Sequence, residues 1–135
     1  MKRIIPILAA ILAVCLSASC NKEEPEKKAT TYTVKMNMPS ATSDAVVKYD
    51  ITAFEYNEEG EKVANNAMSS ALNGQSKTFT ANSRSVKVKI HVKMYAESSS
   101  VTPRYRWVQQ VFYLEEGKNI DILLEDDTTV GTSEP

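Results

Sequence analysis

The segment 104–114 carries the residue types of this chain that are best suited to contact a ligand. An aromatic side chain offers a flat apolar face on which a sugar ring can stack, and tyrosine and tryptophan add a polar edge. Arginine binds hydroxyl or carboxylate oxygens through several N–H donors at once. The predicted ligand-binding residues are Trp107, Tyr105, Tyr113, Arg104 and Arg106. The alternative is that Trp107 is the core tryptophan of a small domain, and the sequence leaves both interpretations open.

Residue types that catalysis or metal binding would need are sparse. His91 is the only histidine, and its place between Ile90 and Val92 predicts a surface residue rather than a general base or a metal ligand. No G-x-S-x-G sequence marks a serine nucleophile, and a zinc site needs several His or Cys ligands. The acidic runs 58–61 and 125–127 lack the spacing of a calcium loop. We therefore expect no enzymatic activity, no cofactor and no metal.

The N-terminal residues have the composition of a secretory signal. Lys2 and Arg3 precede an apolar run over residues 4–18, which is 15 residues long and shorter than the ~20 that span a bilayer as a helix. The sequence L-S-A-S-C, which ends at Cys20, resembles the lipobox of bacterial lipoproteins. The resemblance implies cleavage before Cys20 and a diacylglycerol group on its sulfur, whose acyl chains, of the palmitate type, would hold the protein on membrane lipid.

The segment after Cys20 is charged, contains a proline and has no apolar period, which is typical of a solvated tether. Lys22, Glu23 and Glu24 resemble the lipoprotein export signal of Bacteroidetes-type bacteria, a lysine followed by two acidic residues. That resemblance implies an outer-membrane location facing the cell exterior. Thr128, in the sequence D-T-T, resembles the O-glycosylation acceptor of such bacteria, and a flexible acidic tail is the alternative interpretation of that stretch.

Beyond the tether, the dominant pattern is the alternation of apolar and polar residues that predicts β-strands. Turns are predicted at 57–60 and 115–118, where Gly60 and Gly117 can adopt a positive φ. Residues 64–73 fit a short helix and a strand equally well. The predicted strands cover residues 31–38, 46–56, 75–81, 86–97, 104–114 and 120–124, with a further short strand after Gly60.

These elements predict an all-β fold, a single antiparallel β-sandwich of about seven strands. The stretch 54–63 resembles the strand-turn-strand unit of immunoglobulin-like or transthyretin-like secreted modules. The chain as a whole thus resembles a Bacteroidetes-type surface-exposed lipoprotein with one such domain. The predicted layout is a signal peptide over 1–19, the lipidated cysteine and charged tether over 20–30, the sandwich over 31–125 and a flexible acidic tail over 126–135.

Charge argues against nucleic acid as a partner. Loss of Lys2 and Arg3 with the signal peptide reduces the 16 basic residues to 14 against 17 acidic ones, a net charge of −3. Phosphate binding needs a concentrated basic face instead. We expect a non-catalytic binding or accessory module that contacts a glycan, a host protein or an outer-membrane transporter complex. The alternative is a structural subunit of a surface fibre or envelope complex, joined by strand addition at a sheet edge.

Overall fold

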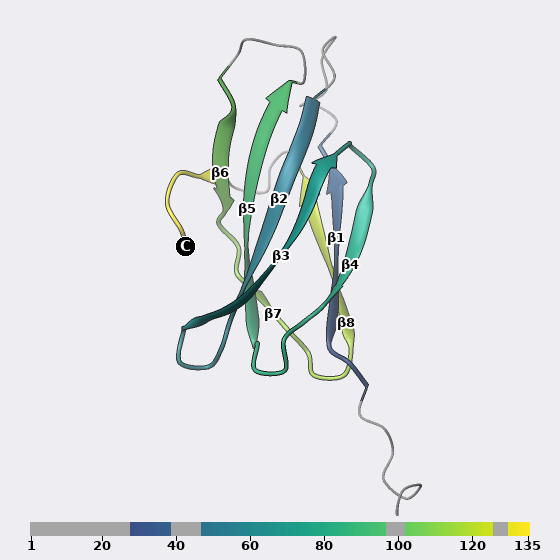
Figure 1. The fold of residues 1–135 in the computed structure, drawn as a ribbon, viewed down its shortest axis with the longest axis vertical. Helices are drawn as coiled ribbons and strands as arrows, with labels where there is room; N and C mark the ends of the chain where they lie inside the picture. The colour runs from purple at the N-terminus through teal and green to yellow at the C-terminus, as the bar shows by residue number, and fades with distance from the viewer. Residues whose placement is uncertain (1–27, 39–46, 97–101, 126–129) are drawn as a thin grey trace, which may run out of the picture.

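The computed structural model describes residues 28–38, 47–96, 102–125 and 130–135 and is all-β (Figure 1). Within these residues the strands form one three-stranded sheet and one six-stranded sheet. The strands are β1 (Thr31–Asn37), β2 (Val47–Tyr56), β3 (Lys62–Ala71), β4 (Ser76–Thr80), β5 (Lys87–Ala96), β6 (Arg104–Val108), β7 (Phe112–Tyr113), β8 (Asn119–Glu125) and β9 (Val130–Gly131). The prediction of an all-β fold is confirmed.

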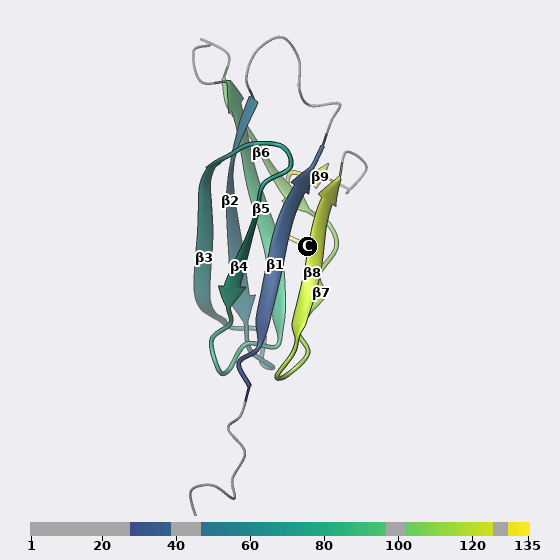
Figure 2. The same ribbon diagram turned by 90° about the vertical axis from the view of Figure 1, so that its right-hand side faces the viewer.

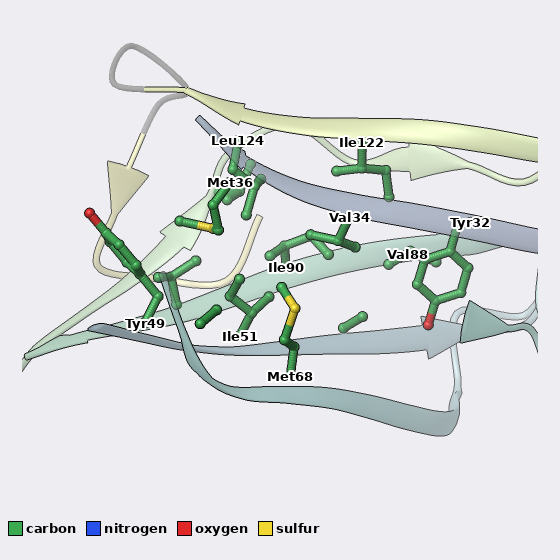
Figure 3. Packing of buried hydrophobic residues seen from close by; sticks show 14 of the residues in the cluster. Tyr32, Val34, Met36, Tyr49, Ile51, Met68, Val88, Ile90, Ile122 and Leu124 are labelled. Carbon is green, nitrogen blue, oxygen red and sulfur yellow. The ribbon is translucent and has the colours of Figure 1, made fainter. Parts of the chain in front are cut away.

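The two sheets lie face to face, with β1, β4 and β8 in one layer and β2, β3, β5 and β6 in the other (Figure 2). The smaller sheet has the order β4-β1-β8, and the larger has the order β3-β2-β5-β6-β9, with β7 paired to β5 below β6. Alternate residues of each sheet point into a shared core, as Val34 and Ile122 of the small sheet do opposite Ile51 and Ile90 of the large one (Figure 3). Burial of this apolar surface is the main force that holds the layers together.

One strand pair departs from the predicted antiparallel arrangement. β1 and β8 run parallel, from Thr31 opposite Asn119 to Asn37 opposite Glu125. Parallel neighbours need a long crossover connection. Here the chain between β1 and β8 forms β4 and all strands of the large sheet except β9 before it returns beside β1. The alternation of each strand is the same for either direction, so the sequence pattern could not reveal this pairing.

The structure defines the strands in two segments, one that the sequence left open between helix and strand and one that it predicted as a single strand. Residues 64–73 belong mostly to the strand β3, and the helix alternative is wrong. The predicted strand 104–114 is two strands, β6 and β7, which both pair with β5. Trp107 lies opposite His91 and Phe112 lies opposite Val88, so two additional residues bulge out between β6 and β7. An insertion of two residues preserves the side-chain alternation, so residues that the predicted strand placed on one side still share a side in β6 and β7.

The described part of the predicted flexible tail is attached to the large sheet. β9 pairs with β6, with Gly131 opposite Trp107, and the chain then runs to the C-terminus, which lies beside β6 in Figure 1. Both predicted glycine turns are present, with φ of 85° at Gly60 and 72° at Gly117. The six residues 130–135, called the strap below, therefore lie beside the aromatic residues that the sequence singled out.

Candidate ligand-binding face

The outer face of the six-stranded sheet carries the aromatic residues of β6. Val108 points into the core. Because side chains alternate along a strand, Trp107 and Tyr105 point to the opposite, outer side. Tyr105 is 55% exposed, and Trp107 is half-buried on this outer face rather than part of the shared core. The open question about Trp107 is thereby answered, because its ring is partly covered by outer-face neighbours and not by the second sheet.

Four rings from three strands form a continuous cluster on this face, called here the aromatic platform: Phe54 of β2, His91 of β5, and Tyr105 and Trp107 of β6. The ring centres of Phe54 and Trp107 are 5.5 Å apart, and those of His91 and Trp107 are 4.8 Å apart. His91 also stacks on Tyr105, with a centroid distance of 5.9 Å and an interplanar angle of 19°. Mutual support of this kind holds an exposed ring in a fixed orientation, which lowers the entropy cost of stacking a ligand on it.

The imidazole of His91 is a part of the platform that the sequence had assigned only to the surface. Partial burial lowers the pKa of His91 below its ordinary value. The ring is therefore neutral near pH 7, with one nitrogen that donates a hydrogen bond and one that accepts. A neutral imidazole among aromatic rings suits contact with an uncharged hydroxyl-rich ligand, and among the described residues no serine or cysteine is hydrogen-bonded to it.

The two arginines of β6 do not join the platform. Because side chains alternate along a strand, Arg104 and Arg106 project from the opposite side of β6 to Tyr105 and Trp107. Arg106 lines a small gap between the sheets with apolar residues such as Val92 and Leu124. The predicted combination of stacking rings with these guanidinium groups is therefore wrong in its geometry, since one strand cannot present adjacent residues on one face.

Tyr113 shares the outer face but stands apart from the platform. It is 68% exposed and lies opposite Lys87 at the other end of β5. In the part of the chain that the structure describes, its ring is not among those in aromatic contact. Of the five predicted binding residues, the structure thus brings Trp107 and Tyr105 together and separates the other three.

Beside the platform the strap is clamped by Tyr56 and Lys89. The Lys89 ammonium group is 3.3 Å from a Glu134 carboxylate oxygen and donates a hydrogen bond of 2.5 Å to the Pro135 carbonyl. The Tyr56 hydroxyl donates to the same Glu134 carboxylate. Gln109 adds a hydrogen bond of 3.2 Å to the Ser133 carbonyl. Lys89 and Tyr56 lie at outward-facing positions that alternation predicts, but nothing in the sequence pattern indicated that Glu134 would return to them.

The strap should detach at acidic pH. The hydrogen bond from Tyr56, with a further contribution from Lys89, lowers the pKa of Glu134 below the ordinary 4.5. A depressed carboxyl pKa means that docking is fully favoured above the free value and is lost as the pH falls through the lowered docked value. We expect NMR signals of Thr132 and Ser133 to shift to those of a detached segment on acidification below about pH 4. The Glu134→Gln variant should lack this transition, and unchanged strap signals in the wild type would contradict the assignment.

A second polar cluster lies inside the domain, where the sequence indicated only apolar packing. Glu55 of β2 is fully buried, on the same inward side as Ile51 and Ala53. One of its oxygens accepts hydrogen bonds from the Tyr32 hydroxyl at 2.8 Å and the Asn66 amide at 2.7 Å. The other accepts from the Asn82 backbone N–H at 2.7 Å and the Ser85 hydroxyl at 2.6 Å.

The Glu55 cluster is suited to holding the fold rather than to chemistry. Burial, together with the Glu55 carboxylate, raises the pKa of Tyr32, so its hydroxyl stays protonated and remains a donor. Both carboxylate oxygens are occupied and no solvent reaches them. The cluster joins β1 of one sheet, β2 and β3 of the other, and the turn before β5. The sequence signal for it was the alternation along the predicted strand 46–56, which puts position 55 on the same side as Ile51 and Ala53.

Several predicted site residues lie outside the described residues, namely Cys20, Lys22, Glu23, Glu24 and Thr128. In the described ranges no helix is long and apolar enough to cross a membrane. Nor do three His, Cys, Asp or Glu side chains gather there in a way that could hold a metal ion. The fold and site thus define an all-β domain of two sheets with an aromatic outer face. Comparison with protein-family models, curated proteins and solved structures found no match to this chain.

Proposed function

We propose that this protein is a non-catalytic binding module of the bacterial outer surface, which recognises a glycan on the aromatic platform. Acylated Cys20 would anchor it to the outer membrane, and the export signal Lys22-Glu23-Glu24 would direct it to the exterior. The observation that carries the binding proposal is the exposed Tyr105 ring, held parallel to His91 beside Trp107. Surface aromatic rings that are fixed in orientation are suited to stack on the apolar face of a sugar.

Two groups of the kind that catalysis uses, His91 and Glu55, are engaged in contacts within the domain. His91 packs against aromatic rings, and the buried Glu55 carboxylate is saturated by hydrogen bonds from its own protein. We therefore propose that the module acts without an enzymatic step and without a cofactor. Stacking would supply the affinity on the platform itself, and hydroxyl contacts from His91 would add direction.

We further propose that the domain is a β-sandwich of the transthyretin-like rather than the immunoglobulin-like class. In immunoglobulin constant domains the first, second, fifth and fourth strands share one sheet. Here the first strand pairs with β4 and β8, whereas the second pairs with β3 and β5. This strand order argues against the immunoglobulin alternative and leaves the transthyretin-like one as the better account.

The structural-subunit alternative is favoured by a separate observation on the small sheet. Among the described residues β8 is an edge strand of that sheet, and its outward-facing Leu123 is 43% exposed. An open strand edge with an exposed apolar residue can accept a strand from another subunit. In that case light crosslinking of intact cells would repeatedly capture one outer-membrane partner at near-equal amounts, through β8 rather than through the platform.

The glycan proposal predicts a loss of binding when Tyr105 is truncated. A Tyr105→Ala variant removes an exposed stacking ring and should weaken binding of the best ligand on a glycan array about tenfold. Tyr113→Ala is the matched control, because it removes the same side chain from the same sheet face away from the platform. Isothermal titration of both variants measures the effect. Equal affinities for Tyr105→Ala and the wild type would remove the platform as the binding site.

A further inference from the structure

The clamp that holds the strap has the chemistry of a carboxylate-binding site. Lys89 and Tyr56 contribute an ammonium group and a hydroxyl donor to the Glu134 carboxylate, and charge-assisted hydrogen bonds of this kind are stronger than neutral ones. Lys62 adds a second positive charge that acts on the same carboxylate. Its ammonium group lies 4.2 Å from the centre of the Phe54 ring and 5.7 Å from that of Tyr56.

This clamp is continuous with the aromatic platform. Phe54 belongs to the platform through its contact with Trp107, and it lies directly opposite Lys89 in the pairing of β2 with β5. Lys89 and His91 are two residues apart on the outer side of β5, a separation of about 7 Å. A sugar chain stacked on the platform would therefore bring a neighbouring residue of the chain within reach of Lys89 and Tyr56.

The surroundings of the clamp favour a negatively charged sugar over a neutral one. The outward side of β5 carries Lys87, Lys89 and Lys93, and Lys93 lies 5.9 Å from the centre of the Tyr105 ring. Lysines on both sides of the stacking rings attract carboxylates more strongly than they attract neutral hydroxyls. The strap shows how such a ligand would be held, since a carboxylate of this chain already occupies the clamp.

We propose that Tyr56, Lys62 and Lys89 bind the carboxylate of an acidic sugar residue, and that Glu134 of the strap occupies this site when no ligand is present. The inference rests on the proposed glycan-binding function and names its ligand class. The strap is then an intramolecular competitor, which lowers the apparent affinity by the fraction of molecules in which it is docked. An acidic glycan must displace Glu134, whereas a neutral glycan on the platform need not.

The test compares a galacturonate tetramer with its methyl ester, which has the same rings without the charge. Calorimetric titration should show that the acid binds more tightly than the ester. The Lys89→Gln variant should bind the acid about fivefold more weakly than the wild type and should bind the ester equally well. Lys87→Gln is the matched control on the same strand face. Glu134→Gln should instead tighten binding of the acid about fivefold and leave binding of the ester unchanged, because the competing carboxylate is lost.

The outcomes separate this inference from the proposed function. If Tyr105→Ala weakens binding of both probes while Lys89→Gln leaves the ratio of the affinities for acid and ester unchanged, the platform stands and the carboxylate site is overturned. If Lys89→Gln selectively weakens the acid while Tyr105→Ala has no effect, the carboxylate site stands without the platform. A direct readout is the NMR signal of the Lys89 side chain in Glu134→Gln titrated with galacturonate. A Lys89 signal that does not move at high galacturonate concentration would overturn the inference in every case.

Discussion

Replacing Glu55 with leucine is expected to lower the free energy of unfolding by about 4 kcal/mol. Leucine fills a similar volume but accepts no hydrogen bond, so the four donors that now converge on the carboxylate all lose this acceptor. Removal of one member of a buried polar cluster costs more than its hydrogen bonds contribute net, because the remaining groups stay desolvated. The backbone N–H of Asn82 is the worst placed, since it cannot rotate toward another acceptor.

Two further variants show whether hydrogen bonding is the cause. Glu55→Gln keeps one acceptor oxygen, and the Tyr32 hydroxyl can turn to accept from the new amide, so we expect a cost of only about 1–2 kcal/mol. Glu58→Leu is the control, because it makes the same replacement at an exposed turn position and should change stability by less than about 0.5 kcal/mol. Denaturant unfolding measures all three. An effect of Glu55→Leu as small as that of Glu58→Leu would show that the cluster does not hold the fold.

Truncation of Trp107 to alanine should have the largest effect on glycan binding, a loss of about 100-fold. The indole contacts both Phe54 and His91, and His91 in turn stacks under Tyr105. Loss of the indole therefore removes its own stacking surface. It also leaves the His91 ring, which holds Tyr105 in place, without its neighbour. Trp107→Phe retains a flat ring at the centre of the platform and should lose no more than about tenfold.

Stability must be measured on the same variants to separate binding from folding. Trp107 is half-buried on the outer face and outside the shared core, so Trp107→Ala should destabilise the domain by no more than about 2 kcal/mol. A folded Trp107→Ala protein with undiminished glycan affinity would contradict a role for the platform. Loss of affinity in Trp107→Ala with retention in Trp107→Phe is the result that the stacking arrangement predicts.

The strands with strict alternation were predictable from the sequence, and so was the face of each side chain. β5 is the clearest case, since Val88, Ile90 and Val92 all point into the core. The same rule, applied to β6, would have excluded a site that combines Tyr105 and Trp107 with Arg104 and Arg106. Applied to β2, it would have identified Glu55 as a buried carboxylate that needs donors. In both strands, the alternation of inward and outward positions along the sequence already indicates which side chains share a face.

The helix-like spacing within residues 64–73 has a local cause. Met68 and Ala71 are both buried although they are three residues apart, a spacing that fits a helix face as well as a strand. In the structure, Ile51 lies opposite Met68 and Tyr49 lies opposite Ala71, so β3 contains one additional residue between them. Ser70 adopts a φ of 54° at this bulge, which returns Ala71 to the inner side.

Other features of the face depend on contacts between distant residues and leave no local signal. The parallel partner of β1 lies in β8, and the partner of Lys89 and Tyr56 is Glu134 of the strap. The platform itself joins residues of β2, β5 and β6, whose proximity follows from strand order and register. Composition indicates that aromatic and basic residues are present, but only the sheet pairing shows which of them are neighbours.

NMR mapping of a bound glycan onto the folded chain tests the central claim most directly. The best ligand from the glycan array is titrated into the isotope-labelled protein, and the residues whose signals shift are identified. The account predicts that the shifts gather at Tyr105, Trp107 and His91 and extend to Lys89. Shifts confined to the β8 strand over Asn119–Glu125, or spread evenly over the surface, would contradict a binding site on the outer face of the six-stranded sheet.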